Sequence, residues 1–174
     1  ILDACPELYS RTVVLNGVSK AYAMTGWRIG YAGGPAEIIK AMKLIQSQST
    51  SNPCSIAQKA AIAALNGDQS MLQTMVKAFH ERHDYLIKRL HAMPGIQVIP
   101  ADGTFYLFPN IQKNITQLGF ADDIAFTEAL LDKTGIALVP GSAFGTPGCI
   151  RLSFATDMKT LEDAMNRLEH FITM

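Results

Sequence analysis

A lysine and an arginine lie in one glycine-containing stretch near the start of the chain. Residues 17–30 read GVSKAYAMTGWRIG, so Lys20 directly follows Ser19, and Arg28 comes eight residues after the lysine. A lysine amine can form an imine with a carbonyl carbon. An arginine guanidinium can hold a phosphate through two parallel hydrogen bonds. The stretch therefore indicates a site for a ligand that carries both an aldehyde and a phosphate.

Pyridoxal 5'-phosphate carries both groups and acts as an electron sink in carbanion chemistry. The alternative for Lys20 and Arg28 is that both are ordinary solvated loop residues, because short basic patterns near glycines are common. The spacing of the two residues alone does not decide between these alternatives.

The whole string resembles the lysine-attachment signature of the class I/II aminotransferases, the aspartate aminotransferase-like family. A small, an apolar and a small residue precede the lysine, and Met-Thr-Gly-Trp-Arg-Ile-Gly follows. The resemblance implies that Lys20 is the Schiff-base lysine and proton shuttle, that Arg28 binds the cofactor phosphate, and that Ser19 assists. Such a lysine acts as the neutral amine, and we expect partial burial beside Arg28 to favour that form. Gly17 stands where several relatives have serine, so one phosphate hydrogen bond is expected from another residue.

A second arginine, Arg151, lies in the run Ile150-Arg151-Leu152-Ser153-Phe154-Ala155, shortly after Gly148. From the residues alone, Arg151 would pair with a carboxylate of its own domain, since charged groups are rarely buried unpaired. The run also resembles the substrate strand of the same family. That resemblance implies that Arg151 holds the substrate α-carboxylate through two hydrogen bonds.

Two weaker motifs have both a functional and a structural reading. Ser51-Asn52-Pro53 resembles the family's loop that approaches the cofactor phosphate of a neighbouring subunit, but the same residues also make ordinary turns. Gly103-Thr104-Phe105-Tyr106 resembles a segment at the mouth of the family's site, or it is a strand with core aromatics. Some aspartate enzymes have an arginine for the distal substrate carboxylate just before the first loop, and this chain has Gln46-Ser47-Gln48 there.

The composition predicts a folded protein with no polyanionic partner. Of 174 residues, 48% are hydrophobic and 17% charged, which is enough apolar material for a core. Fifteen basic and fifteen acidic side chains cancel, so we expect neither nucleic acid nor a membrane as a partner. Cys5, Cys54 and Cys149 are odd in number and far apart, which favours reduced thiols and a cytoplasmic location. His80 and His83 have no third ligand at a suitable spacing, so no metal site is expected.

The order of periodic segments predicts the α/β fold class. Strands are expected at residues 12–16, 29–33, 96–99, 104–108, 136–139 and 149–154. Helices are expected at residues 56–65 and 70–93; one further helix should begin at residue 35, one should end at residue 133, and one should begin at residue 158. Asp122 or Asp123 should cap the helix that ends before Gly135. The resemblance implies the C-terminal part of a fold type I pyridoxal-phosphate-dependent transferase. Residues 1–80 would be the tail of the large domain, and residues 81–174 the small α/β domain.

The resemblance covers nearly the whole chain but only the second half of a family member. Members pair the cofactor ring nitrogen with an aspartate some three dozen residues before the lysine, and Asp3 lies too close to Lys20 to be that residue. We therefore expect an aminotransferase of amino-acid metabolism, homodimeric when full length, that exchanges an L-amino acid, aspartate or aromatic, with a 2-oxo acid. The 174-residue chain alone should be inactive. The first two strands should have open edges, with disorder, self-pairing or an altered dimer in residues 1–50.

Two other functions stay open. The chain could be a non-catalytic remnant or interaction domain that keeps the small-domain fold. It could also belong to a pyridoxal lyase or synthase, because these enzymes share the lysine motif.

Overall fold

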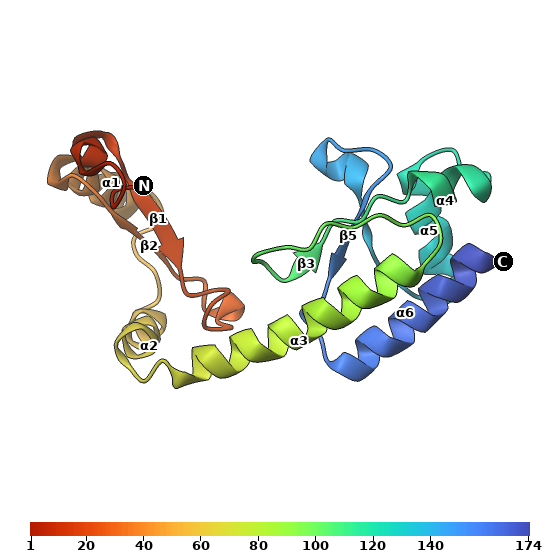
Figure 1. Ribbon diagram of the computed structural model, residues 1–174. Helices are drawn as coiled ribbons and strands as arrows, with labels where there is room; N and C mark the ends of the chain where they lie inside the picture. The colour runs from red at the N-terminus through yellow and green to blue at the C-terminus, as the bar shows by residue number, and fades with distance from the viewer. The chain divides into compact units, whose positions relative to one another are not determined.

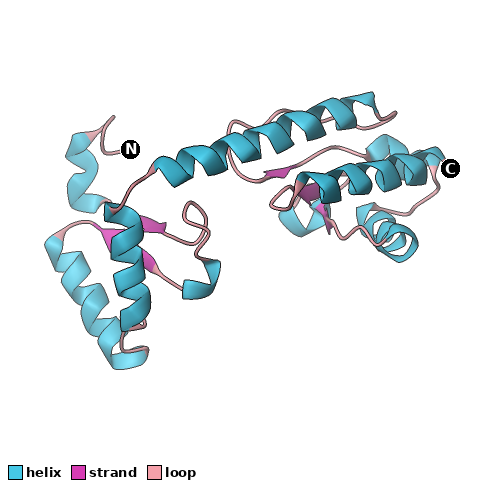
Figure 2. Ribbon diagram, turned by 90° about the horizontal axis from the view of Figure 1, so that it is seen from below, coloured by secondary structure: helices cyan, strands magenta, loops and turns pink.

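The structure is a computed structural model that describes residues 1–174. Contacts divide the chain into two units, Ile1–Gln73 and Thr74–Met174 (Figure 1). Short strands and longer helices make up both units (Figure 2), in agreement with the predicted α/β class. The division falls inside one long helix. The predicted boundary between the large and small domains, at residues 80 and 81, stays a prediction. None of the helices combines the length and apolar character that crossing a bilayer requires.

The first unit consists of one strand pair, two α-helices and two short 3-10 helices. Its elements are the 3-10 helix Pro6–Arg11, β1 (Val14–Gly17), the 3-10 helix Thr25–Trp27, β2 (Gly30–Gly33), α1 (Ala36–Ser49) and α2 (Ser55–Asn66). The two strands are antiparallel, with Val14 opposite Gly33 and Gly17 opposite Gly30. Both strands were predicted from sequence, and each begins one or two residues later than expected.

The small core of the first unit lies between the β1–β2 loop and α2. Val18, Met24 and Ile29 of the loop are buried against Ala57 and Ala61 of the helix. The two alanines are four residues apart and therefore share one face of α2. Their short side chains form the α2 side of this core.

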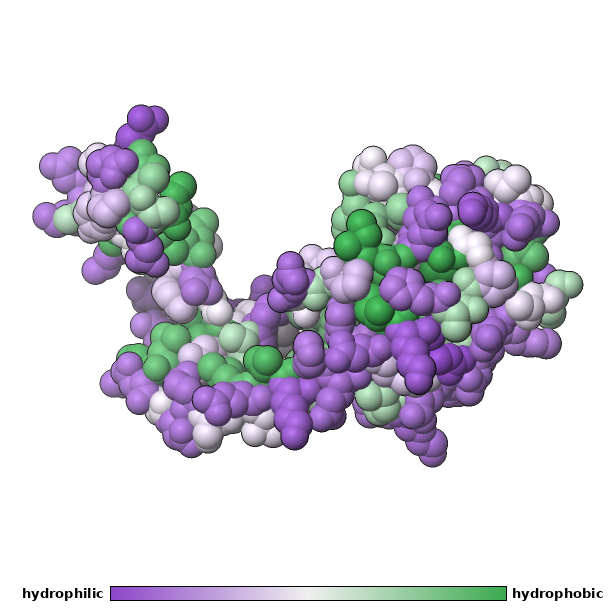
Figure 3. All heavy atoms as spheres, viewed as in Figure 1, coloured by the Kyte–Doolittle hydropathy of each residue, from purple (hydrophilic) through white to green (hydrophobic).

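Much apolar surface of the first unit stays exposed (Figure 3). Leu15, Leu44, Ile45 and Ile56 are each at least 65% exposed. The β1–β2 pair has no third strand, so both outer edges are open, as expected from the sequence. The expected disorder, self-pairing or altered dimer of residues 1–50 stays a prediction.

The second unit packs helices around a three-stranded sheet. Its elements are most of α3 (Ser70–Ala92), β3 (Tyr106–Leu107), α4 (Gln112–Gln117), α5 (Asp123–Thr134), β4 (Val139–Pro140), the 3-10 helix Gly141–Phe144, β5 (Ile150–Ser153) and α6 (Met158–Thr173). The strand order is β3-β5-β4, and both pairings are antiparallel. β5 is therefore the central strand.

Buried side chains of α3 and α6 form part of the core of this unit. Leu86 and Leu90 of α3 and Met165 and Leu168 of α6 are almost fully buried. The two helices lie alongside each other (Figure 1), and the Arg89 guanidinium links them by donating to Asn166 Oδ1 and Glu169 Oε2, each at 3.0 Å.

The sequence correctly predicts the residues that begin and end α5. The Asp122 carboxylate accepts a hydrogen bond from the Ala125 N–H at 2.8 Å, which is the expected cap of α5. Gly135 ends the helix in the left-handed conformation, with φ of 72°.

Two predicted strands need correction, and one helix was not predicted. The segment 96–99 is not a strand, because its only ladder contact is a single bridge between Gln97 and Asn110. The strand expected at 136–139 shrinks to Val139–Pro140 at the sheet edge, where the missing proline N–H does no harm. α4 was not predicted because its sequence is polar and short. Asn110 Oδ1 accepts from the Gln112 N–H at 3.0 Å at the start of that helix.

Candidate functional site

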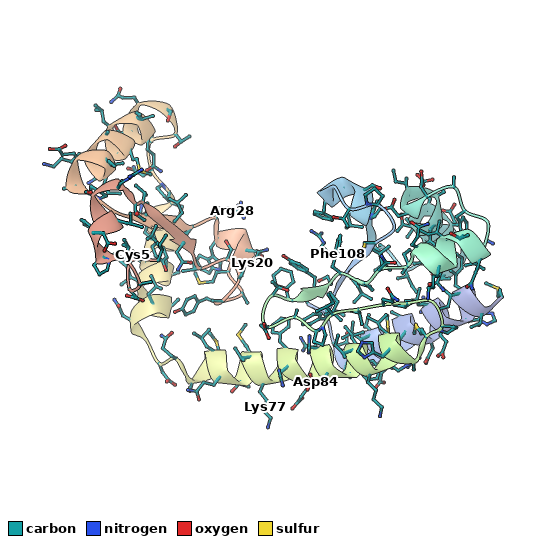
Figure 4. All side chains as sticks on the ribbon, turned by 45° about the horizontal axis from the view of Figure 1, so that its top comes forward. Cys5, Lys20, Arg28, Lys77, Asp84 and Phe108 are labelled. Carbon is teal, nitrogen blue, oxygen red and sulfur yellow. The ribbon has the colours of Figure 1, made fainter.

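Lys20 and Arg28 lie in the loop that joins β1 to β2. Gly17 is the last residue of β1 and is paired with Gly30, the first residue of β2. The loop therefore leaves and re-enters the strand pair at the same end, and it places both basic residues there. Figure 4 shows Lys20 and Arg28 together beyond this end of the strands.

The loop is held in place by packing on α2 and by one side-chain hydrogen bond. Val18 is fully buried, and the Tyr22 hydroxyl and Gln69 Oε1 are 2.9 Å apart. Ser19 is half-buried, but Lys20 is exposed. The expected partial burial of Lys20 is therefore wrong for this chain, because the small core of the first unit covers Val18 and does not extend to the lysine.

Arg28 lines a pocket of the first unit. Its guanidinium Nη1 donates to the Thr25 carbonyl at 2.8 Å, inside the same loop. The pocket is formed by the loop on one side and the start of α2 on the other, with Ala23, Gly26, Trp27, Arg28, Pro53, Cys54, Ile56 and Ala57 as lining residues. An arginine in such a pocket beside a helix N-terminus is suited to an anion.

Cys54 immediately precedes α2 in the same pocket, and its side chain is exposed. The neighbouring backbone N–H groups of Ala57 and Ile56 lower the pKa of the Cys54 thiol below its usual range. The thiol does not cap α2 through a side-chain hydrogen bond. The pKa is therefore lowered by the proximity of the N–H groups at the positive end of the helix.

All four non-glycine residues with positive φ fall in the motifs that the sequence indicated. They are Ala23 and Arg28 in the lysine motif (53° and 54°), Ser51 in Ser51-Asn52-Pro53 (64°) and Thr104 in the Gly103–Tyr106 segment (70°). Left-handed backbone at non-glycine residues is strained and is concentrated at functional sites. This supports a functional reading of the two weaker motifs as well as the lysine motif.

Arg151 lies on the central strand of the second unit. Its neighbours Ile150 and Leu152 are buried on one face of β5, and Arg151 is half-buried on the other. The guanidinium carbon is 4.8 Å from the centre of the Phe144 ring and 5.7 Å from the centre of the Tyr106 ring. No carboxylate pairs with it. The structure therefore does not show the internal ion pair that was the alternative explanation for Arg151, and its N–H groups can bind an anion.

Asp123 has a role that sequence reasoning missed. Its carboxylate is fully buried and accepts hydrogen bonds from the Ser142 N–H at 2.7 Å and the Ser142 hydroxyl at 2.5 Å. Burial alone would raise the pKa of Asp123, but hydrogen bonds from Ser142, Gly148 and its own N–H hold it below the usual value. The available signal was the pair Asp122-Asp123, because only one of two adjacent aspartates can cap the helix.

His80 and His83 both interact with Asp84. His80 Nε2 is 3.4 Å from one carboxylate oxygen, and His83 Nδ1 is 3.0 Å from the other. His83 Nε2 accepts a hydrogen bond from the Ala101 N–H at 3.1 Å, so the neutral tautomer with its proton on Nδ1 satisfies both partners. His83 therefore links α3 to the segment that precedes β3.

The first unit presents a lysine, an arginine and a hydroxyl in one loop, and the second presents an arginine held between aromatic rings. These groups are typical of an enzyme that binds an aldehyde-bearing phosphate and a carboxylate. The chain belongs to the aminotransferase class I and II family, whose model matches residues 2–168. Enzymes of this family depend on pyridoxal 5'-phosphate, which confirms the cofactor expected from the motif at the level of the family.

Individual relatives agree with this assignment. The chain is 55% identical to an aspartate/prephenate aminotransferase of Nitrosomonas europaea, over 99% of this chain and 45% of the relative. It matches the crystal structure of the aspartate aminotransferase of Rhizobium meliloti with a TM-score of 0.90 and 41% identity, over 99% and 44% of the two chains. It matches an aromatic aminotransferase of Pyrococcus horikoshii with the same TM-score and 34% identity, over 99% and 46%.

The chain thus spans less than half the length of the relatives it matches. The predicted fold, a part of a class I aminotransferase, is confirmed by these matches.

Proposed function

We propose that this chain supplies the cofactor lysine and the substrate arginine of a pyridoxal-phosphate-dependent aminotransferase. The enzyme would transfer an amino group between an L-amino acid and a 2-oxo acid. The observation that carries the proposal is the β1–β2 loop, which places Lys20 and Arg28 at one end of a strand pair. The names of the relatives support a substrate range that includes aspartate, prephenate and aromatic amino acids, with prephenate as an oxo acid.

The residues of the loop fit the cofactor in number and chemistry. An amine, a guanidinium and a hydroxyl, from Lys20, Arg28 and Ser19, correspond to one aldehyde and one phosphate. When bound, the cofactor supplies an electron sink for the bond at the substrate α-carbon. Lys20 Nζ would hold the cofactor and, once displaced by the substrate amine, move a proton at the α-carbon. Arg28 would donate to the phosphate, with Ser19 Oγ as a further donor.

Arg151 would bind the substrate α-carboxylate. The rings of Phe144 and Tyr106 lie against its guanidinium and would restrict its orientation. A planar guanidinium that is already oriented loses little freedom when it forms two parallel hydrogen bonds to a carboxylate. This contact would fix the substrate so that its amine can reach the cofactor.

The proposed enzyme needs more than these 174 residues. The open edges of the β1–β2 pair and the exposed apolar side chains of the first unit are surfaces that a larger protein would cover. We propose that the active form is a cytoplasmic homodimer of the complete gene product. The 174-residue chain alone is expected to show no transamination.

A borohydride experiment tests the role of Lys20. The complete gene product is incubated with pyridoxal 5'-phosphate, reduced with borohydride, digested and mapped by mass spectrometry. The cofactor mass should be found on the peptide that contains Lys20 and should be lost in Lys20→Ala. The matched control is Lys40→Ala, an exposed lysine on α1. Labelling at other lysines with Lys20 unlabelled would refute the assignment.

An exchange assay separates the remaining functions. The complete gene product is offered amino acids and 2-oxo acids, and both products are measured. Amino-group exchange supports an aminotransferase. Elimination or condensation without exchange indicates a lyase or synthase, and cofactor binding without any turnover indicates a non-catalytic remnant. Transamination by the 174-residue chain alone would contradict the expected inactivity.

A further inference from the structure

We propose that Asp123 is a positioning residue for substrate binding. It fixes the turn that carries Phe144, and Phe144 in turn orients Arg151. The inference rests on the proposed function, in which Arg151 binds the substrate carboxylate.

The Asp123 carboxylate has an unusual environment. It is fully buried and makes no ion pair with any lysine, arginine or histidine. A buried charge without a counter-charge is costly unless hydrogen bonds and dipoles compensate it. Asp123 is the first residue of α5, where the helix dipole favours a negative charge. The remaining compensation comes largely from Ser142, which lies nineteen residues away in sequence.

Ser142 belongs to a short turn in which its own carbonyl accepts a hydrogen bond from the Gly145 N–H at 3.1 Å. It lies in the 3-10 helix Gly141–Phe144. The Gly141 N–H donates to the Cys149 carbonyl at 2.8 Å, and the Thr146 N–H donates back to the Gly141 carbonyl at 3.0 Å. These bonds fix the beginning of the turn. Asp123 adds two charge-assisted bonds at the next residue, one to the backbone and one to the side chain.

Phe144 depends on the turn for its position. Its side chain is only partly covered, with 48% of the residue exposed, so burial alone holds it weakly. The ring has an edge-to-face contact with Phe108, at 6.0 Å between centroids, and it lies 4.8 Å from the Arg151 guanidinium carbon. Phe108, labelled in Figure 4, precedes Pro109, whose carbonyl accepts from the Ile150 N–H of β5.

The consequence concerns affinity for the substrate. With Phe144 in place, a stack on the ring restricts the Arg151 guanidinium, and fewer rotamers are lost when a carboxylate binds. If the turn loosens, the ring moves away and Arg151 gains freedom. Binding of carboxylates then weakens, whereas the proton transfers at Lys20 are not directly affected.

The test uses the complete gene product with the variants Ser142→Ala, Asp123→Asn and Phe144→Leu. KM and kcat are measured for the amino acid and the 2-oxo acid, and the dissociation constant of maleate, a non-reactive dicarboxylate, is measured by calorimetry. The matched control is Asp132→Asn, an exposed carboxylate on the same helix. We expect KM and the maleate dissociation constant to rise by about 3- to 10-fold, a loss of roughly one good contact, with kcat within about twofold of the wild type.

The outcomes separate this inference from the proposed function. A merely structural role would lower the active fraction and kcat and leave KM and maleate affinity unchanged, which would overturn the inference. If Asp123→Asn does not fold, Ser142→Ala and Phe144→Leu test the inference instead. Each removes a smaller part of the contacts that connect Asp123 to Arg151. If Arg151→Lys itself leaves carboxylate binding unchanged, the proposed role of Arg151 fails. If Arg151→Lys weakens binding but Ser142→Ala and Phe144→Leu do not, only the positioning role fails.

Discussion

Gly17 and Gly30 face each other at the end of the β1–β2 pair, where the candidate cofactor loop begins and ends. A Cβ added to Gly17 would lie 3.2 Å from the Ile29 carbonyl oxygen, and one added to Gly30 would lie 3.3 Å from the Asn16 carbonyl oxygen. The two strands therefore approach closely here. This explains why Lys20 and Arg28, although separated in sequence, belong to one local structure.

Replacing Arg151 by lysine should weaken substrate binding. Lysine keeps the charge but cannot form two parallel hydrogen bonds to a carboxylate or stack its head group on Phe144. In the complete gene product we expect kcat/KM to fall by about 100-fold, equivalent to about 2.7 kcal/mol. Arg167→Lys is the control, because Arg167 is engaged with Asp163 and the Thr134 carbonyl instead. Equal effects of the two substitutions would contradict the special role of Arg151.

Cys54 should react faster with thiol reagents than Cys149. Cys54 is exposed and its pKa is lowered by the N–H groups at the start of α2. Cys149 is buried, and its pKa is raised by burial and by the nearby Asp123 carboxylate. Iodoacetamide labelling of the 174-residue chain, followed by mass spectrometry, should show Cys54 modified first at neutral pH. The two cysteines should react alike in urea, and equal rates in the folded chain would refute the prediction.

Substituting Gly141 by alanine should destabilise the second unit. An added Cβ would clash with the Thr146 carbonyl oxygen and would lie 2.8 Å from the Cys149 carbonyl oxygen, and both are backbone atoms that cannot move independently. We expect the free energy of unfolding to fall by about 3 kcal/mol, as for strongly overpacked positions. Gly103→Ala is the control, since an added Cβ there meets nothing within 4 Å. Urea unfolding followed by circular dichroism measures both, and a Gly141→Ala variant as stable as Gly103→Ala would disprove the expectation.

Asp123 should make stability depend on pH in the acid range. Its pKa is lower in the folded chain than in the unfolded chain. The carboxylate therefore stabilises the fold fully above its unfolded pKa of about 4, and this stabilisation is lost as pH falls through the lower folded value. Asp123→Asn should cost about 2–4 kcal/mol at pH 7, because charge-assisted hydrogen bonds to Ser142 are lost.

The difference between wild type and Asp123→Asn should shrink as the pH is lowered from 7 to 3. Urea unfolding at a series of pH values gives this difference, with the exposed Asp132→Asn as the control for a general charge effect. A difference that stays constant over this range would show that Asp123 carries no shifted pKa.

The lysine motif could be predicted from the sequence because it is local. It occupies a loop between two neighbouring strands, and the glycines, small residues and β-prone runs that specify such a loop are all contained in residues 12–33. The same holds for α5 and α6, where caps and apolar periodicity act over a few turns. The short strands were predicted less well, because ladder pairing depends on distant partners. The segment 96–99 stays extended with only one bridge.

The surroundings of Arg151 and Asp123 were decided by the tertiary structure. The sequence identifies Arg151 as a candidate for carboxylate binding, but only the fold brings Phe144 and Tyr106 over its guanidinium. Asp123 and Ser142 are nineteen residues apart, and no periodicity links a helix start to a later turn. Likewise, the exposure of Lys20 depends on which parts of the loop α2 covers. Local motifs thus identified the candidate site residues, whereas long-range packing determined how those residues are held.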